Sequence, residues 1–360
     1  PRLLRIVESS DDSALAITRM LPAIVSVLRR STYLVFLIEN PDALRRSVEL
    51  VTLSPWIADQ LESYPILFYE LTDRSVKEVA VSRKELEGEL REAMRAIEVG
   101  DLEIQMDTLR QFKLAATLKI AAMELLDELS IMEASDGLTA LAEVVLDRSI
   151  EFAWSHLEIR HGIPGDESGQ PLMERLAIVA YGKAGGLELA YGSDLDLVFL
   201  CPNHIKGNTD GRNQVNNNVF YVRLGQRIIH ILTSFTRFGI LYSADMRLKP
   251  QGNKGPLVAT INAFERYQDN EAWTWEHQAL IRARYVAGDS TLGQAFEEIR
   301  SRVIGTVRES TELLGNVLQM REKMRAHLAS PANNTTEDGS EILGKFDLKH
   351  DSGAIVDIEF

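Results

Sequence analysis

The stretch Ala180–Leu200, AYGKAGGLELAYGSDLDLVFL, holds the residue types and spacings best suited to chemistry. It reads as a buried strand, a glycine-rich turn, a short helical turn and a second strand that opens with Asp194 and Asp196. Because side chains alternate between the faces of a β-strand, these carboxylates share one face while apolar residues pack on the other. Two adjacent carboxylates destabilise an apolar strand unless a cation neutralises them, and we expect a divalent metal in that role.

The glycine-rich turn before the acidic pair is suited to binding an anion. Gly182, Gly185 and Gly186 would let backbone N–H groups approach a ligand closely, and such groups form anion sites. Lys183 adds a cation within the turn, and Ser193 adds a hydroxyl just before the acids. The turn is not a P-loop, because the Lys-Ser/Thr ending of that motif is missing. We expect it to bind phosphate.

A third expected strand, 241–249, carries another acid and two cations. Alternation along it would place Asp245, Arg247 and Lys249 on one face. Together with the acidic pair, a third carboxylate could hold two divalent ions, which clamp the attacking and leaving oxygens in phosphoryl or nucleotidyl transfer. Arg247 and Lys249 would then neutralise the outer phosphates.

Each part alone is weak evidence for a site. An isolated Asp-X-Asp pair usually lies on a surface, a lone GKAGG turn is unspecific, and Asp245 alone could be an ordinary salt-bridge partner of Arg247. Their combination is stronger, because all the parts fall in the single α/β segment that we expect. The pattern indicates metal-dependent nucleotidyl transfer.

The elements that position these residues are predicted from the spacing of apolar residues. Residues 1–165 predict an all-helical domain, with long helices at 83–98, 102–130 and 136–160. This part contains no nucleophile, metal-ligand spacing or glycine loop. The segment 161–171, rich in glycine, proline and acid, is the expected linker.

The rest of the chain predicts a small α/β domain at 166–262 and a helical region at 263–360. The elements expected in the α/β domain are strands at 176–180, from 194, at 241–249 and at 256–261, and a helix at 213–238. After it we expect helices at 262–270, 271–286, 289–304 and 309–329, and a terminal strand-like segment within 346–360. The predicted fold class is α+β, predominantly helical, with a small mixed sheet flanked by helical domains.

Composition and charge exclude several classes of protein. The 360 residues are 45% hydrophobic, and no apolar run approaches the ~20 residues that span a bilayer, so we expect no membrane segment. A formal charge of −14 argues against a general nucleic-acid binder. The single cysteine, Cys201, excludes internal disulfides and fits a cytoplasmic protein. A start at Pro1 without Met and an end inside a strand-like pattern suggest a fragment.

These residues carry a resemblance to a known family. YGKAGGLELAYGSDLDLVFL resembles the signature of the nucleotidyltransferase superfamily and, in its detail, that of the bacterial glutamine synthetase adenylyltransferases. Segments across nearly the whole chain are similar to that family: 54–71, 106–125, 242–252, 270–284, 320–328 and 346–360. The resemblance implies an enzyme of two related halves, one attaching AMP to a tyrosine of glutamine synthetase and one removing it by phosphorolysis. Segments 272–284 and 320–328 resemble the adenylylating half more closely.

The resemblance also implies residue roles. The metal-binding and catalytic carboxylates fall on Asp194, Asp196 and Asp245, with Asp245 as the candidate base for the tyrosine phenol. ATP and its phosphates would be bound by Gly182, Lys183, Gly185, Gly186, Ser193, Arg247 and Lys249. The implied metal is Mg²⁺, with Mn²⁺ as an alternative, and the implied protein partners are glutamine synthetase and the signalling protein PII. Four residues match family segments without an assigned role: Arg282, Arg284, Asp357 and Glu359.

Three alternatives stay open. The chain could be the deadenylylating half, which would release ADP from adenylylated glutamine synthetase in the presence of phosphate. It could be a non-catalytic module that binds glutamine synthetase or PII, although such a scaffold has no need of three carboxylates. An RNA-directed nucleotidyltransferase is disfavoured by the acidic charge.

Overall fold

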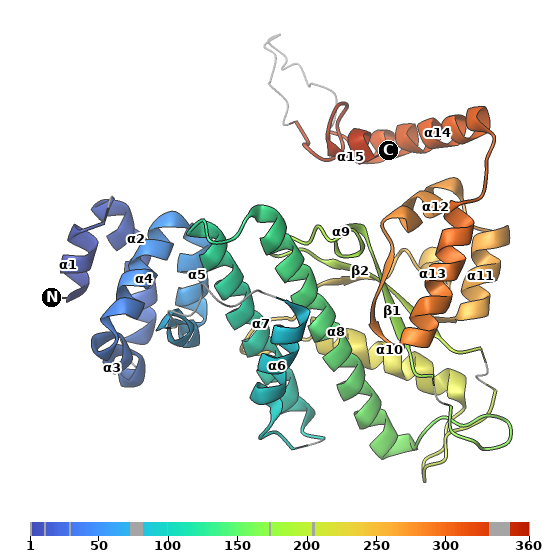
Figure 1. Cartoon of the computed structure of the whole chain (residues 1–360), viewed down its shortest axis with the longest axis horizontal. Helices are drawn as coiled ribbons and strands as arrows, with labels where there is room; N and C mark the ends of the chain where they lie inside the picture. The colour runs from blue at the N-terminus through green and yellow to red at the C-terminus, as the bar shows by residue number, and fades with distance from the viewer. Residues whose placement is uncertain are drawn as a thin grey trace, which may run out of the picture. The chain divides into compact units, whose positions relative to one another are not determined.

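The computed structural model describes residues 2–10, 12–28, 30–72, 82–98, 100–172, 174–203, 206–330 and 346–359 (Figure 1). The chain divides into two compact units, the first joining Pro1–Phe264 to Arg282–Phe296 and the second joining Glu265–Ile281 to Glu297–Phe360. Helices predominate in the described residues, which also form one mixed sheet of five strands, so the predicted fold class is confirmed. Among the described helices, none has the length and apolar character needed to span a bilayer. The three predicted domain boundaries stay a prediction.

The N-terminal helices pack around an apolar cluster of their own. They are α1 Arg2–Glu8, α2 Ser13–Val27, α3 Ser31–Glu39, α4 Pro41–Leu53, α5 Pro55–Ser63 and the 3₁₀ helix η1 Pro65–Thr72. Met20, Leu50 and Phe68 are fully buried within this cluster. Ser54 caps α5 by accepting a hydrogen bond from the N–H of Ile57, which satisfies one of the free donors at the helix start.

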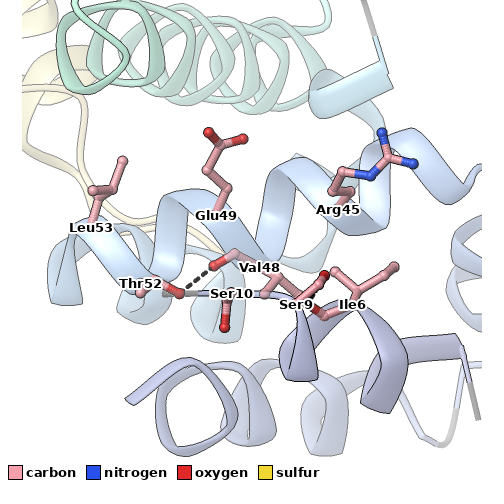
Figure 2. Close-up of a pocket in the computed structure, with 8 residues that line it drawn as sticks. All are labelled: Ile6, Ser9, Ser10, Arg45, Val48, Glu49, Thr52 and Leu53. Atoms are coloured by element: carbon pink, nitrogen blue, oxygen red, sulfur yellow. Dashed lines mark hydrogen bonds between the residues drawn. The ribbon is translucent and has the colours of Figure 1, made fainter. Parts of the chain in front are cut away.

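A cavity of about 330 Å³ opens beside α1 and α4 (Figure 2). Its walls combine Ser9 and Ser10, just after α1, with Arg45, Glu49 and Thr52 of α4. The three hydroxyl groups each donate to a backbone carbonyl three or four residues earlier. These groups therefore satisfy helix backbone, and none of the predicted site residues lines this cavity.

Three longer helices follow: α6 Arg83–Met94, α7 Leu102–Leu125 and α8 Ile131–His161. They confirm the three helices predicted for this part, but α8 begins at Ile131 and runs through the break expected at 135–137. The reason is a capping box, in which Ser130 and Glu133 bond each other's backbone N–H and start the helix earlier. α7 contributes Leu118 to the first apolar cluster and Leu109 to the larger one around the sheet, so it joins the two.

The sheet has the strand order β3-β2-β1-β5, and β4 pairs with the second half of β2. The strands are β1 Ala177–Tyr181, β2 Leu195–Cys201, β3 Ala244–Asp245, β4 Val258–Thr260 and β5 Arg284–Gly288. β1 is antiparallel to β2 and β5, whereas β2 is parallel to β3 and β4. The short helix α9, Gly182–Gly185, follows β1 directly, and α10, Asn217–Thr233, packs against α8, β3 and β4.

The prediction of a strand at 241–249 is wrong for most of its length. Only Ala244 and Asp245 pair, with Leu195 and Asp196 of β2. The chain then turns, because the Asp245 carboxylate accepts a hydrogen bond from the backbone N–H of Arg247, 2.8 Å from nitrogen to Oδ1. Strand alternation therefore does not extend to the basic residues beyond Asp245.

Two predictions for the C-terminal part are also corrected. The helix expected at 271–286 ends early, as α12 Thr274–Ile281, because the following residues form β5 and pair with the edge of β1. The strand-like terminal segment contains a helix, α15 Ile355–Glu359, whose Asp357 carboxylate accepts the N–H of Gly353 in the manner of a cap. The other predicted helices are confirmed as α11 Ile261–Asn270, α13 Ser290–Ile304 and α14 Ser310–Leu328.

Candidate active site

The glycine turn and the acidic strand are in direct contact. Gly182 has a φ of +56°, and a Cβ atom on it would lie 2.6 Å from Oδ2 of Asp196. Gly185 is equally confined, since its Cβ would lie 1.9 Å from the carbonyl oxygen of Arg282. The N–H of Gly186 donates to the carbonyl of Gly182 at 3.0 Å, so that amide stabilises the turn and is not free for a ligand. The first amides of α9 have no acceptor within the helix.

Asp196 and Asp245 are direct register partners on the parallel strands β2 and β3. Register partners point to the same face of a sheet, so the two carboxylates are neighbours. Asp194 lies exposed just before β2 rather than within it. In the part of the chain that the structure describes, no three acidic, histidine or cysteine side chains are grouped closely enough to hold a metal. The donor set nonetheless fits Mg²⁺ chemically, because that ion prefers carboxylate oxygens.

Arg247 is the cation that lies among these acids. Its Nε and Nη2 atoms lie 2.7 and 2.5 Å from Oδ2 of Asp245. The hydrogen bond and charge of Asp245 raise the pKa of Arg247, and the charges of Asp196 and Asp194 raise it further. In return, Arg247 lowers the pKa of Asp245. Asp245 and Arg247 are therefore close together, as the sequence predicts. A turn brings them together, rather than a shared face of one strand.

Two other predicted phosphate ligands stabilise backbone. The buried amine of Lys249 donates to the carbonyls of Gly252 and, at 3.0 Å, Gly255, and burial lowers the pKa of Lys249. The Ser193 hydroxyl accepts the N–H of Ala190 at 3.2 Å. Their binding to phosphate stays a prediction. Lys183, by contrast, is exposed on α9.

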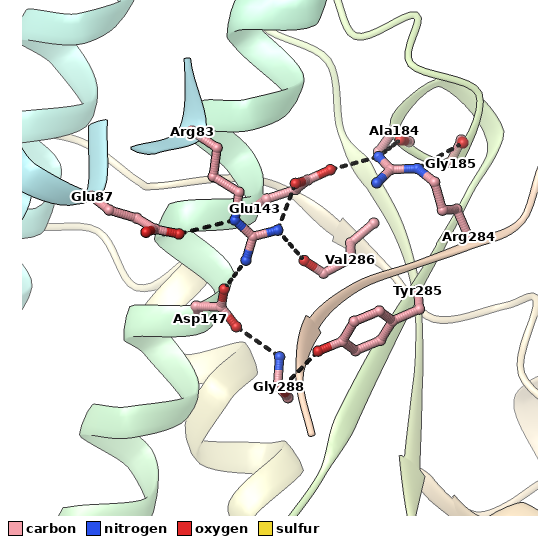
Figure 3. A network of polar contacts seen from close by, with 10 residues as sticks. All are labelled: Arg83, Glu87, Glu143, Asp147, Ala184, Gly185, Arg284, Tyr285, Val286 and Gly288. Atoms are coloured by element: carbon pink, nitrogen blue, oxygen red, sulfur yellow. Dashed lines mark hydrogen bonds and ion pairs between the residues drawn. The ribbon is translucent and has the colours of Figure 1, made fainter. Parts of the chain in front are cut away.

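Two arginines without an assigned role contact the glycine turn from β5 and the residues before it. Arg284 donates to the carbonyls of Ala184 and Gly185, at 3.2 and 3.3 Å (Figure 3). The guanidinium of Arg282 forms an ion pair with Glu188, and its Nε atom lies 3.1 Å from the place where a Cβ of Gly186 would be. Arg284 therefore stabilises the turn directly, and Arg282 bonds to Glu188 just after it.

The residue that the sequence did not predict is Glu143, a buried acid of α8. Its carboxylate pairs with Arg284 at 2.6 Å and with Arg83 of α6 at 2.8 Å (Figure 3). Arg83 also pairs with Asp147, whose other oxygen accepts the N–H of Gly288 at 2.7 Å. These ion pairs connect α6 and α8 to the glycine turn. A sequence signal did exist, because Glu143 is a lone acid within the apolar run 141–146.

The chain is similar to known proteins over its whole length. A family model described as "Glutamate-ammonia ligase adenylyltransferase" matches residues 44–299. Over its whole length the chain is 47% identical to the bifunctional glutamine synthetase adenylyltransferase/adenylyl-removing enzyme of Pseudomonas putida. It is 46% and 44% identical, again over its whole length, to the proteins of the same name from Pseudomonas aeruginosa and Hahella chejuensis.

The chain belongs to the glutamate-ammonia ligase adenylyltransferase family. The resemblance found in the sequence is confirmed. This member of the adenylyltransferase family spans 37% of the length of each of those three relatives. The acidic residues, the glycine turn and Glu143 all lie within the part that the family model matches.

The other two residues without an assigned role are Asp357 and Glu359. They lie in the second compact unit, outside the residues that the adenylyltransferase family model matches. Asp357 forms ion pairs with the buried Arg321 and, at 3.3 Å, with Arg325. The backbone carbonyl of Glu359 accepts a hydrogen bond from the side chain of Gln278 at 3.2 Å. These contacts hold α15 against α14 and α12 within that unit.

Proposed function

We propose that this chain transfers AMP from ATP to a tyrosine of glutamine synthetase and releases pyrophosphate. The observation that carries the proposal is the position of Asp196, which lies against Gly182 of the glycine turn and beside Asp245 on the next strand. The relatives are named as bifunctional, adenylylating and adenylyl-removing. The adenylylating assignment rests on segments 272–284 and 320–328, which resemble that half.

The proposed metal is Mg²⁺, with Mn²⁺ as an alternative, held by Asp194, Asp196 and Asp245. When bound, it would supply Lewis-acid polarisation of the phosphate oxygens and neutralise charge on the leaving pyrophosphate. Support comes from the chemistry of the donors and from Arg247, a cation whose pKa all three carboxylates raise. The signalling protein PII is the proposed regulatory partner, as the family resemblance implies.

The chain's own residues would act in a defined order. The glycine turn holds the phosphates, and hydrogen bonds from Arg284 occupy two of its carbonyls. A tyrosine phenol has a pKa of about 10 and must lose its proton to attack well. Asp245 can accept that proton only after Arg247 has left it, because the ion pair lowers the pKa of Asp245. Arg247, exposed to solvent, is then free to bind the pyrophosphate.

The test is incubation of the chain with purified glutamine synthetase, Mg²⁺ and ATP labelled at its α-phosphate. We expect label on a tyrosine of glutamine synthetase, and loss of that label in Asp196→Asn and Asp194→Asn. Normal labelling by both variants would exclude the assigned carboxylates.

The alternatives give different products. The deadenylylating half would instead release ADP from adenylylated glutamine synthetase when phosphate is added. A non-catalytic module would bind glutamine synthetase or PII and produce neither pyrophosphate nor ADP. Measuring pyrophosphate release, ADP release and binding in one preparation therefore separates the three functions.

A further inference from the structure

A second polar cavity, of about 390 Å³, lies between α8 and α10, and arginine and histidine side chains dominate its lining. The basic residues that line it are His156, Arg160, His161, Arg223, Arg227 and His230. Among the residues that the structure describes, no acidic one lines this cavity, which we call the α8/α10 pocket. On α10 the three basic residues are spaced four and three positions apart, so they share one face of that helix.

Two guanidinium groups of this pocket form hydrogen bonds with imidazole rings rather than ion pairs with carboxylates. Nη1 of Arg223 lies 3.0 Å from Nε2 of His161. The other ring nitrogen of His161 lies 2.8 Å from the backbone carbonyl of Asn213, which can only accept. His161 therefore donates to that carbonyl and accepts from Arg223 as a neutral ring. Nη2 of Arg227 lies 3.3 Å from Nε2 of His156 in a similar pair.

The positive charge of the α8/α10 pocket is not compensated locally. Among the described residues, Arg160, Arg223 and Arg227 form no ion pair with a carboxylate, whereas Arg83, Arg247 and Arg284 near the glycine turn all do. Burial and then the charges of Arg227 and Arg160 lower the pKa of His156. This concentration of positive charge occurs in a chain whose formal net charge is −14.

We propose that the α8/α10 pocket binds a compact anion with two or more negative charges, carried by phosphoryl or carboxylate groups. Arginine presents a planar fork of N–H donors that matches both groups, and a cavity of this size falls in the ~300–1,000 Å³ range of small-molecule sites. The pocket shares no residue with the nucleotide site. The proposal therefore does not depend on transfer of AMP.

The test is calorimetric titration of the full chain at low salt with two probes, inorganic phosphate and citrate. We expect at least one probe to bind, and Arg227→Gln to raise its Kd about tenfold, the effect of losing one charge-assisted hydrogen bond. Binding of phosphate alone identifies a phosphoryl ligand, and binding of citrate alone identifies a polycarboxylate. Binding of neither probe overturns the proposal.

Two controls keep the test specific. Arg91→Gln removes the same charge from an exposed position on α6, and its Kd should match that of the unchanged chain. Binding should also persist with saturating MgATP, since a phosphate held at the glycine turn would be displaced. Equal weakening by Arg91→Gln and Arg227→Gln, or complete displacement by MgATP, would refute the pocket. Arg223→Gln serves as a second variant, because Arg223 lines the pocket at an exposed position.

Discussion

Asp196 leaves no room for a side chain at Gly182, because a Cβ atom on Gly182 would lie 2.6 Å from Oδ2 of Asp196. This contact ties the first acid of β2 to the turn that follows β1. The two strands are antiparallel neighbours, with Tyr181 opposite Asp196, so their pairing register alone brings the turn to the carboxylate. One pair of strands, β1 and β2, thus positions both the glycine turn and the acidic strand.

Replacing Gly182 with alanine should displace this carboxylate. We expect at least a hundredfold loss of the proposed AMP transfer, because a shift of about 1 Å at a reacting group has effects of that size. Gly192→Ala is the matched control, since Gly192 also has a positive φ, +70°, but open space around its Cβ position. Both variants should lose about 1–2 kcal/mol in urea unfolding from backbone strain. Equal activity in the two variants would contradict the contact.

Replacing Arg247 with glutamine should change the titration of Asp245. The arginine lowers the pKa of this carboxyl, so without it Asp245 will protonate at a higher pH. The measurement is a carbon-13 NMR titration of the aspartate carboxyls in metal-free protein. Arg237→Gln, which removes an exposed arginine paired with Asp107 at 2.9 Å, should leave Asp245 unchanged. A pKa of Asp245 that is the same with and without Arg247 would contradict the pairing.

Glu143 should act as a positioning residue for the glycine turn. Glu143→Gln removes the carboxylate that pairs with Arg284 and one of the carboxylates that pair with Arg83, and losing these partly exposed ion pairs should cost about 1–2 kcal/mol of unfolding free energy. Because Arg284 would then hold the turn less firmly, the KM for ATP should rise about tenfold while kcat changes less.

The control for this variant lies on the same network. Glu87→Gln removes another partner of Arg83, at 3.0 Å, from a more exposed position. We expect it to change stability by less than about 0.5 kcal/mol and to leave the KM for ATP unchanged. An unchanged KM in Glu143→Gln would show that the ion pairs support only the fold.

Cys201 should be chemically inert in the folded chain. It is 2% exposed at the end of β2, and burial raises the pKa of its thiol to about 12. Since the thiolate is the reactive form, a thiol reagent such as dithionitrobenzoate should not label Cys201 at pH 8 until urea unfolds the chain. Rapid labelling without urea would mean that β2 opens easily.

Periodicity was sufficient for the long helices, because their apolar spacing is a local property of α6, α7 and α8. It was insufficient for β5, whose residues follow the helical run of α12 and become a strand only because the edge of β1 offers partners about a hundred residues away. The length of the third strand was overestimated for a different reason. Asp245 ends it by binding the N–H of Arg247, and alternation carries no sign of such a turn.

The sequence predicted which acids lie near the glycine turn, but not the ion pairs that connect the turn to α6 and α8. Asp196 and Asp245 could be paired from alternation and resemblance, and the register places them side by side. Glu143 was missed because a single acid in a helix has no spacing rule that points to a partner 141 residues along the chain at Arg284. The ion pair exists only after the sheet has assembled.

The position of β5 has a practical consequence for dissecting the protein. A recombinant piece ending near residue 262 would contain the turn and all the predicted acids, yet it would lack the strand that pairs with β1. The exposed N–H and C=O groups of β1 would then be open to pairing with another molecule, and such edges promote aggregation. Expression of the part that contains the candidate site should therefore extend to Phe296, the end of the first compact unit.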